Sequence, residues 1–161
     1  MAETLDGWLH AGPPWCAPRP GASRLRPGAR VLVSGGTGAL GRQLTHHLRQ
    51  RWDADVVPLS RHVIAPSGDF DAVFHLAGSL DDPWGSKRDV LLALRASVTA
   101  DHWILFSSIA GALPGLATGI EDYAAANRWL DDFARSTPGA LSIAWAPWRG
   151  AGMAGAHAAA L

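Results

Sequence analysis

The chain has 161 residues, 48% of them hydrophobic and 17% charged, which is enough for one compact domain of ordinary size. Its 14 basic side chains balance 14 acidic ones, so no broad electrostatic field exists to hold nucleic acid or an anionic membrane surface. With one cysteine, Cys16, and no His/Cys cluster at zinc spacing, we expect neither a disulfide framework nor a structural metal site. This cysteine usage is typical of a reducing cytoplasm.

The first 29 residues hold five prolines and show no apolar periodicity. They lack the basic cluster and apolar run of a secretory signal, so we expect an extended arm or linker over residues 1–29 and a compact domain over 30–161. An uncharged stretch at 103–120 is interrupted by serine, threonine, proline and glycine. It therefore predicts a strand running into a loop rather than a transmembrane helix.

Within the domain, short apolar runs alternate with segments of helical spacing. This alternation predicts an α/β fold: a Rossmann-like, doubly wound, mostly parallel sheet of about five strands in the order 2-1-3-4-5, with ligands at the carboxyl ends of the strands. We expect strands at 30–34, 56–59, 72–77, 103–107 and 141–145, and helices at 40–52, 87–96 and 122–135.

A glycine-rich turn separates the first strand from the first helix. Glycines there permit a tight turn and let backbone N–H groups approach a pyrophosphate at the helix N-terminus, although such a turn can also bind nothing. The second strand ends in Ser60 and Arg61 rather than in a carboxylate that would hold a ribose hydroxyl, which favours the 2′-phosphate of NADP over a solvated loop charge. The residues of the turn are Gly35, Gly36, Thr37, Gly38, Ala39, Leu40 and Gly41.

Several motifs follow one another in a recognisable order: VLVSGGTGALG, PLSR, VFHLAGSLDD, ILFSSIAG, YAAAN with LDDFA, and SIAWAPW with GM. Together they resemble the short-chain dehydrogenase/reductase superfamily and, within it, the ketoreductase domains of modular polyketide synthases, over residues 24–154. The resemblance implies NADPH-dependent reduction of a β-ketoacyl thioester that is carried by an acyl carrier protein or a synthase module.

The resemblance also implies catalytic roles. Tyr123 and Asn127 are four residues apart on a helix, so both side chains emerge on one face. In the resembled family this tyrosine protonates the substrate carbonyl and the asparagine supports it, while Ser108, with Ser107 as the alternative, hydrogen-bonds the same oxygen. Lys87 continues the apolar stripe of its helix and is expected to face inward and lower the pKa of the phenol, or else to reach out to water.

Further site residues follow from the resemblance. His75, Ala77 and Gly78 resemble the segment that lines the cofactor, although a histidine on this strand can equally be a core residue. Pro147 and Trp148 resemble a segment near the nicotinamide. The triplet Leu80, Asp81 and Asp82 matches the motif of B-type ketoreductases, which give a D-configured product, and an ordinary acidic turn is the alternative.

The chain departs from the family pattern in length. Only about nine residues separate Arg61 from the third strand, where the family has a helix, a strand and a further helix, and the chain ends eight residues after Met153, before most of the lid. We expect the second strand to be an open edge, with apolar surface covered by the arm, a second copy or a partner domain. The alternatives to an active reductase are a non-catalytic relic that serves as a structural or docking module, and an epimerase-like activity on the same acyl chain.

Overall fold

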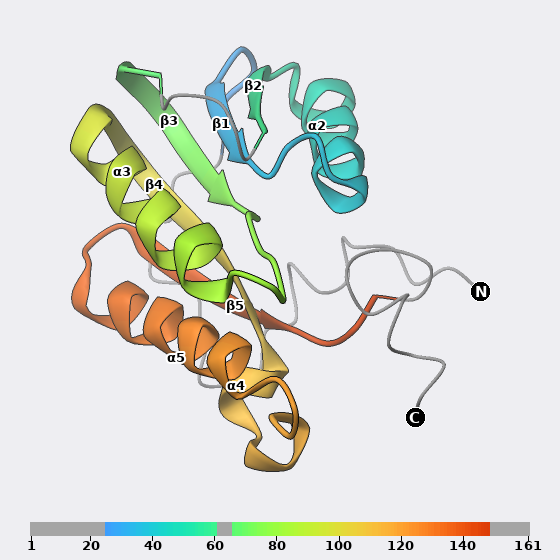
Figure 1. Cartoon of the computed structure of the whole chain (residues 1–161). Helices are drawn as coiled ribbons and strands as arrows, with labels where there is room; N and C mark the ends of the chain where they lie inside the picture. Colours follow the sequence, from blue (N-terminus) through green and yellow to red (C-terminus); the bar gives the residue numbers. More distant parts are fainter. Residues whose placement is uncertain (1–24, 61–65, 149–161) are drawn as a thin grey trace, which may run out of the picture.

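The computed structural model describes residues 25–60 and 66–148. Its centre is a five-stranded sheet, parallel at every pairing, in the order β2-β1-β3-β4-β5 (Figure 1). This confirms the predicted strand order and fold class. Most of the arm, Arg61 and Met153 lie outside the described residues. The strands are β1 (Arg30–Ser34), β2 (Asp55–Leu59), β3 (Gly68–His75), β4 (Val98–Ser108) and β5 (Ala140–Trp145).

Helices follow the strands in the predicted places, with one difference. The helix expected at 87–96 begins as a π-helical turn, η2 (Gly85–Asp89), and only then continues as α3 (Val90–Ser97). A π turn contains one extra residue compared with an α-helical turn and is frequently found at functional sites. The other helical elements are α2 (Ala39–Trp52), α4 (Ile109–Ala112), the 3-10 turn η3 (Pro114–Leu116) and α5 (Glu121–Ser136).

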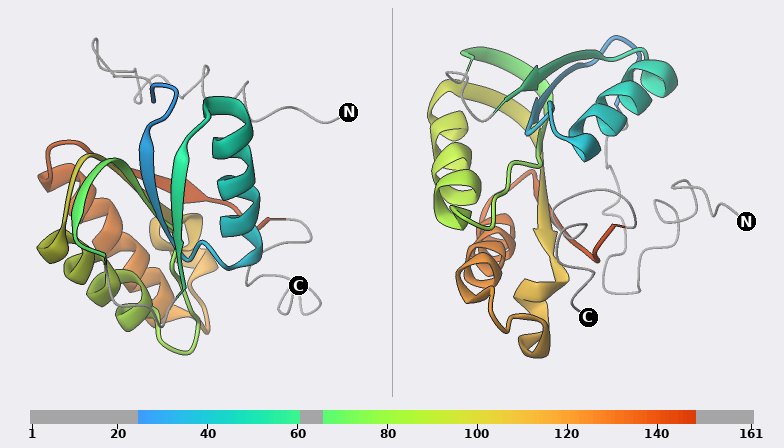
Figure 2. Two further views of the ribbon diagram at one scale, coloured as in Figure 1. Left: turned by 90° about the horizontal axis from the view of Figure 1, so that it is seen from above. Right: turned by 45° about the vertical axis from the view of Figure 1, so that its right-hand side comes forward.

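The sheet separates two hydrophobic cores. Helices α3 and α5 lie on one face and α2 lies on the other, over β1 and β2 (Figures 1 and 2). Because side chains alternate along a strand, consecutive residues of β1 enter different cores. The core under α3 and α5 includes Leu32, Val73, Leu91, Leu94, Trp103, Leu105 and Leu130, and the core under α2 includes Val31, Val33, Leu48, Val56 and Ala72.

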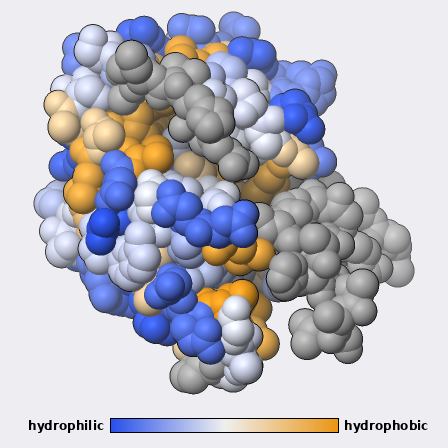
Figure 3. All heavy atoms as spheres, viewed as in Figure 1, coloured by the Kyte–Doolittle hydropathy of each residue, from blue (hydrophilic) through white to orange (hydrophobic). Residues whose placement is uncertain are grey.

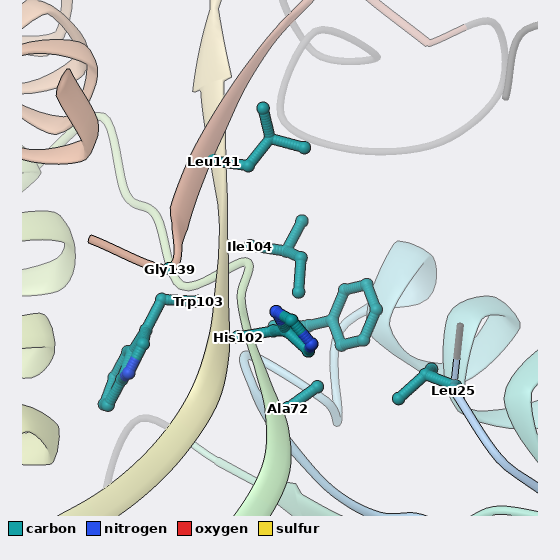
Figure 4. Close-up of a pocket in the computed structure, with 8 residues that line it drawn as sticks. Leu25, Ala72, His102, Trp103, Ile104, Gly139 and Leu141 are labelled. Carbon is teal, nitrogen blue, oxygen red and sulfur yellow. The ribbon is translucent and has the colours of Figure 1, made fainter. Parts of the chain in front are cut away.

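Beside α2, the same face of the sheet carries an apolar hollow of about 210 Å³ over β3, β4 and β5. Figure 4 shows Ile104 and Leu141 on the side of the hollow, while Trp103 turns to the opposite side. Leu141 is 54% exposed. Among the described residues, this apolar surface lies over β3, β4 and β5, whereas the expected uncovered surface was at the β2 edge.

Strand β2 is the predicted outer edge, and its outward backbone lacks one donor and has one carbonyl already hydrogen-bonded. The Asp55 N–H donates to Ala29 O and Leu59 O accepts from Gly36 N–H, so residues 55, 57 and 59 face β1 and the alternate residues face outward. Of these, the Val56 carbonyl accepts a bond from Arg49 Nη2 at 2.9 Å, and Pro58 has no N–H. Such an edge resists the addition of a strand.

The outer surface is mixed. On the face seen in Figure 3, hydrophobic residues form separate groups among hydrophilic ones. None of the helices in residues 25–60 and 66–148 is both long and apolar enough to cross a membrane. The large hydrophobic side chains with substantial exposure are Leu92, Leu113, Leu116 and Leu141.

The packing of α2 against the glycine turn leads to a stability prediction. A Cβ on Gly41 would lie 2.2 Å from the Gly35 carbonyl oxygen, whereas a Cβ on Gly115 would meet nothing within 4 Å. Alanine normally favours a helix, but here it must displace backbone atoms. We expect Gly41→Ala to lower the free energy of unfolding by about 1–3 kcal/mol in urea titrations. Gly115→Ala, the control, should stay within about 0.5 kcal/mol of the parent; equal effects would contradict the close packing.

Candidate active site

The carboxyl ends of five parallel strands lie along one edge of the sheet, where open α/β sheets bind ligands. The strands end there in Ser34, Leu59, His75, Ser108 and Trp145. The loops that follow carry the glycine turn, the Leu80–Asp82 triplet and the segment before α5. The fold therefore gathers the predicted site residues at this edge, and their contacts divide them into two groups.

The first group is the glycine turn. Gly35 has a φ of +75°, and a Cβ there would lie 2.9 Å from the Ala77 backbone nitrogen. Gly36 is packed as closely against Pro58. Thr37, Gly38 and Ala39 are exposed, Leu40 is half-buried, and the first turn of α2 has no acidic side chain. A backbone that is open to solvent at the positive end of a helix fits the pyrophosphate of a dinucleotide.

The second group is centred on Lys87, the chain's single lysine, which lies in the π turn η2 and is 3% exposed. Its Nζ donates a hydrogen bond to the Phe106 carbonyl of β4 at 2.9 Å. The same Nζ lies 5.5 Å from the centroid of the Tyr123 ring, within the range of a cation–π contact. Of the two orientations considered from the sequence, the structure shows the inward one, beside the predicted catalytic tyrosine.

Burial lowers the pKa of Lys87 from 10.5 to about 8, because the charged ammonium loses its hydration. The carboxylate of Asp131 opposes this effect and raises the pKa. Asp131 is itself positioned by Ser142, whose hydroxyl donates to Oδ1 at 2.5 Å. The ammonium therefore contacts a carbonyl and an aromatic ring, and the charge of a carboxylate farther away favours its charged form.

Asn127 is completely buried on α5, one turn after Tyr123. Its side-chain Nδ2 donates to the Tyr123 carbonyl at 2.7 Å, and its Oδ1 has no hydrogen-bond partner among the described residues. A buried acceptor without a partner is costly and marks a place where a further donor would be stabilised. Asn127 thus fixes the helix turn of Tyr123 and leaves one acceptor unused.

The two serines at the end of β4 have different environments. Ser107 is buried, and its hydroxyl donates to the Asn127 carbonyl at 3.2 Å. Ser108 is half-buried and acts as the N-cap of α4, where its Oγ accepts from the Ala110 N–H at 3.2 Å. A capping hydroxyl uses a lone pair and keeps its hydrogen for another acceptor. The geometry therefore favours Ser108 over Ser107 as the donor to a substrate carbonyl.

His75 connects the two groups of residues. Its Nδ1 lies 2.6 Å from Ser34 Oγ and its Nε2 lies 2.8 Å from the Lys87 carbonyl oxygen. The side chain is 0% exposed, and its pKa is lowered from 6.5 to about 3, first by burial and then by the charge of Lys87. Of the two interpretations made from the sequence, the structure therefore supports the core histidine, because the ring has no nitrogen left to contact a cofactor.

The remaining predicted residues lie around this edge. Asp82 is exposed and starts the Lys87 turn: its Oδ1 accepts from Gly85 N–H at 3.0 Å. This capping contact gives Asp82 a structural role that is independent of any role in stereochemistry. Asp81 and Pro147 are exposed, Ser60, Gly78, Leu80 and Trp148 are half-buried, and Trp148 packs on Trp145 with ring centroids 4.8 Å apart.

Two residues that contact or influence this site, Ser34 and Asp131, were not among those predicted from the sequence. Asp131 follows Tyr123 and Asn127 at a further spacing of four, so the helix period could have placed all three on one face. Ser34 is a polar residue at the end of an apolar strand, but only the pairing of β1 with β3, which sets Ser34 opposite His75, shows its partner. Among the described residues, no cluster of three or more His, Cys, Asp or Glu is arranged to hold a metal ion.

Comparison with known proteins gives a consistent result. The family model described as "KR domain" matches residues 87–150, a segment that begins at Lys87 and includes Ser108, Tyr123 and Asn127. The chain belongs to the KR domain family. A ketoreductase domain from the bacillaene assembly line has a similar fold, with a TM-score of 0.62 and 21% sequence identity over 78% of this chain and 45% of that one.

The curated relatives of this KR chain are polyketide synthases. Polyketide synthase GfsB of Streptomyces halstedii is 37% identical over 189 aligned positions, which cover 81% of this chain and 3% of GfsB. Erythronolide synthase EryA3 of Saccharopolyspora erythraea is 36% identical over 159 positions, which cover 86% of this chain and 5% of EryA3. The alignment with GfsB is longer than the chain's own 161 residues, so this relative has internal residues that the chain lacks. This confirms the predicted internal shortening.

The environment of Lys87 predicts how it titrates. Because Lys87 is the only lysine, ¹³C-labelled lysine gives a single side-chain signal. We expect that signal to titrate near pH 8 in NMR spectra of the folded protein. Asp131→Asn should move the titration to lower pH, because the carboxylate that favours the ammonium is removed.

Asp132→Asn is the matched control, since Asp132 is the next residue of α5 and is exposed. It should leave the Lys87 titration unchanged. A lysine signal that titrates near pH 10.5 in the parent would contradict the burial of the ammonium.

Proposed function

We propose that this KR chain uses NADPH to reduce a β-ketoacyl thioester, presented by an acyl carrier protein within a polyketide synthase, to the β-hydroxyacyl product. The observation that carries the proposal is the enclosed ammonium of Lys87 above the ring of Tyr123. The reduction of a carbonyl needs an acid at the carbonyl oxygen, and a positive charge beside a phenol stabilises the negative charge that develops when the phenol gives its proton.

The residues have separate roles in this reaction. Ser108 donates a hydrogen bond to the substrate carbonyl oxygen and orients it, and the Tyr123 phenol gives its proton to the same oxygen. A bound nicotinamide supplies the hydride that adds to the carbonyl carbon, so the C=O bond becomes an alcohol. Asn127 holds the backbone of the Tyr123 turn through its bond to the Tyr123 carbonyl.

The sign of the electrostatic effect agrees with these roles. As the phenol gives its proton to the substrate, negative charge develops on the Tyr123 oxygen, and the positive charge of Lys87 beside the ring stabilises it. Because the pKa of Lys87 is about 8, the charge is lost as the pH rises through this value. We therefore propose that reduction slows on the alkaline side of pH 8.

The glycine turn supports a dinucleotide cofactor. Its exposed backbone lies at the N-terminus of α2, and the absence of an acidic side chain in the first helical turn leaves the positive end of the helix available to a pyrophosphate. We propose that Ser60 and Arg61, which follow β2, hold the 2′-phosphate of NADPH. The stereochemical role of Leu80, Asp81 and Asp82, a D-configured product, is part of the same proposal.

Two observations favour a second candidate function, a non-catalytic relic that serves as a docking or structural module. The family model matches residues 87–150, which excludes the glycine turn, and GfsB has internal residues that this chain lacks. Such a relic would keep the fold but neither bind nor oxidise NADPH. Binding of NADPH, measured by its fluorescence or by calorimetry beside NADH, separates the two candidates.

Catalysis is tested by Tyr123→Phe, which removes the proton and keeps the ring. We expect the reduction of a small β-ketothioester, followed by NADPH absorbance, to fall by about 10²- to 10⁴-fold because proton transfer is lost. NADPH binding should persist, since the cofactor site is unchanged. Full activity in the variant would remove Tyr123 from the mechanism, and a parent protein that binds NADPH but never oxidises it would support the relic.

Cofactor choice is tested by Arg61→Ala. Loss of a charge-assisted contact with the 2′-phosphate should weaken NADPH binding by about 10- to 100-fold and leave NADH binding little changed. Arg51→Ala, at the exposed C-terminal end of α2, is the control and should affect neither cofactor. Equal losses for both cofactors in Arg61→Ala would show that the arginine does not recognise the phosphate.

A further inference from the structure

The side chain of His75 joins three elements of the protein. It is the last residue of β3 and is completely buried. Its Nδ1 lies 2.6 Å from Ser34 Oγ at the end of β1, and its Nε2 lies 2.8 Å from the Lys87 carbonyl oxygen in η2. Ser34 directly precedes the glycine turn, so a short chain of hydrogen bonds connects that turn to the backbone of Lys87.

The partners determine the tautomer of this histidine. A carbonyl oxygen can only accept a hydrogen bond, so the hydrogen between His75 and Lys87 is on Nε2. Burial and the nearby charge of Lys87 lower the pKa of His75 to about 3, so the ring is neutral and Nδ1 carries a lone pair. The hydroxyl of Ser34 must then donate to Nδ1. In this series of hydrogen bonds, Ser34 Oγ donates to His75 Nδ1, and His75 Nε2 donates to the Lys87 carbonyl.

Lys87 is therefore held both at its backbone and at the end of its side chain. The bond from His75 fixes its backbone from the side of β3, and the Phe106 carbonyl of β4 accepts a bond from its ammonium. The Tyr123 ring lies beside the ammonium, and the titratable groups that interact electrostatically with Lys87 are Asp131 on α5 and His75 on β3. The π turn supplies no regular α-helical ladder at this point, so contacts from neighbouring strands are well placed to set its position.

We propose that His75 is a positioning residue for Lys87: as a neutral Nε2–H tautomer, oriented by Ser34, it holds the Lys87 turn so that the ammonium stays over the Tyr123 ring. The inference deepens the proposed reduction and rests on it for its catalytic consequence. The positioning itself is a property of the folded chain and can be measured without turnover.

Two amide variants separate the two contacts of the ring. In His75→Gln the amide nitrogen can take the place of Nε2 and still donate to the Lys87 carbonyl. In His75→Asn the amide oxygen can take the place of Nδ1 and accept from Ser34, but the side chain is too short to reach Lys87. The two variants have the same functional group and each keeps one of the two contacts, so comparing them shows which contact sets the position of Lys87.

The first readout is the titration of Lys87, followed by NMR through its single labelled side chain. If the bond holds the turn, His75→Asn gives water access to the ammonium, and its titration moves from about pH 8 toward the ordinary value of 10.5. His75→Gln should titrate like the parent. Ser34→Ala, which keeps the imidazole but removes the group that orients it, should shift in the same direction as His75→Asn and serves if that variant does not fold.

The second readout is kinetic. We expect kcat to fall by about 10- to 100-fold in His75→Asn, the cost of a misplaced catalytic group, with the Kd for NADPH unchanged. The alkaline limb of the kcat profile should move to higher pH, because a hydrated Lys87 keeps its charge to a higher pH. His75→Gln should restore most of the rate and the original profile.

The outcomes are distinguishable. Equal changes in His75→Asn and His75→Gln would show that the ring only fills space, and an unchanged Lys87 titration in His75→Asn and Ser34→Ala would overturn the positioning. A parent protein without turnover would overturn the proposed reduction alone, because the Lys87 titrations still decide whether His75 positions the turn.

Discussion

An ammonium group enclosed by protein loses its hydration, and the structure must offer replacement partners or shift its pKa. Lys87 shows both responses. Its Nζ has a carbonyl partner on β4 and an aromatic ring on α5, the charge of Asp131 favours the ammonium, and its pKa is nevertheless lowered to about 8. The same charge helps to keep His75 neutral, and this neutrality fixes which ring nitrogen donates. The arrangement of the site therefore follows from one buried charge.

Much of the fold was predictable because its signals are local. The alternation of apolar runs and helical segments gave the strand order, and the stripe through Leu91 and Leu94 predicted that Lys87 faces inward. The contact between Ser34 and His75 was not predictable, because it joins residues 41 positions apart and depends on the register of β1 and β3. The π turn was not predictable either, because an apolar stripe along a helix does not show that one turn contains an extra residue.

In the site, too, local features were predictable and contacts between distant segments were not. The four-residue spacing of Tyr123 and Asn127 predicted a shared face, and the structure adds that Asn127 bonds the Tyr123 backbone. The sequence motif suggested that His75 lines the cofactor, whereas its burial and its two partners make it a core residue. A motif identifies a position in the chain, but the partners of that position depend on neighbouring strands. Asp82 illustrates the same point, because its carboxylate caps the Lys87 turn.

The outer edge of β2 has a consequence for attempts to lengthen this chain. A grafted strand would need the outward N–H and C=O groups of β2, but Pro58 has no N–H and the Val56 carbonyl is bonded to Arg49. Replacing Pro58 would restore one donor to this edge, and removing the Arg49 guanidinium would free the Val56 carbonyl for a grafted strand.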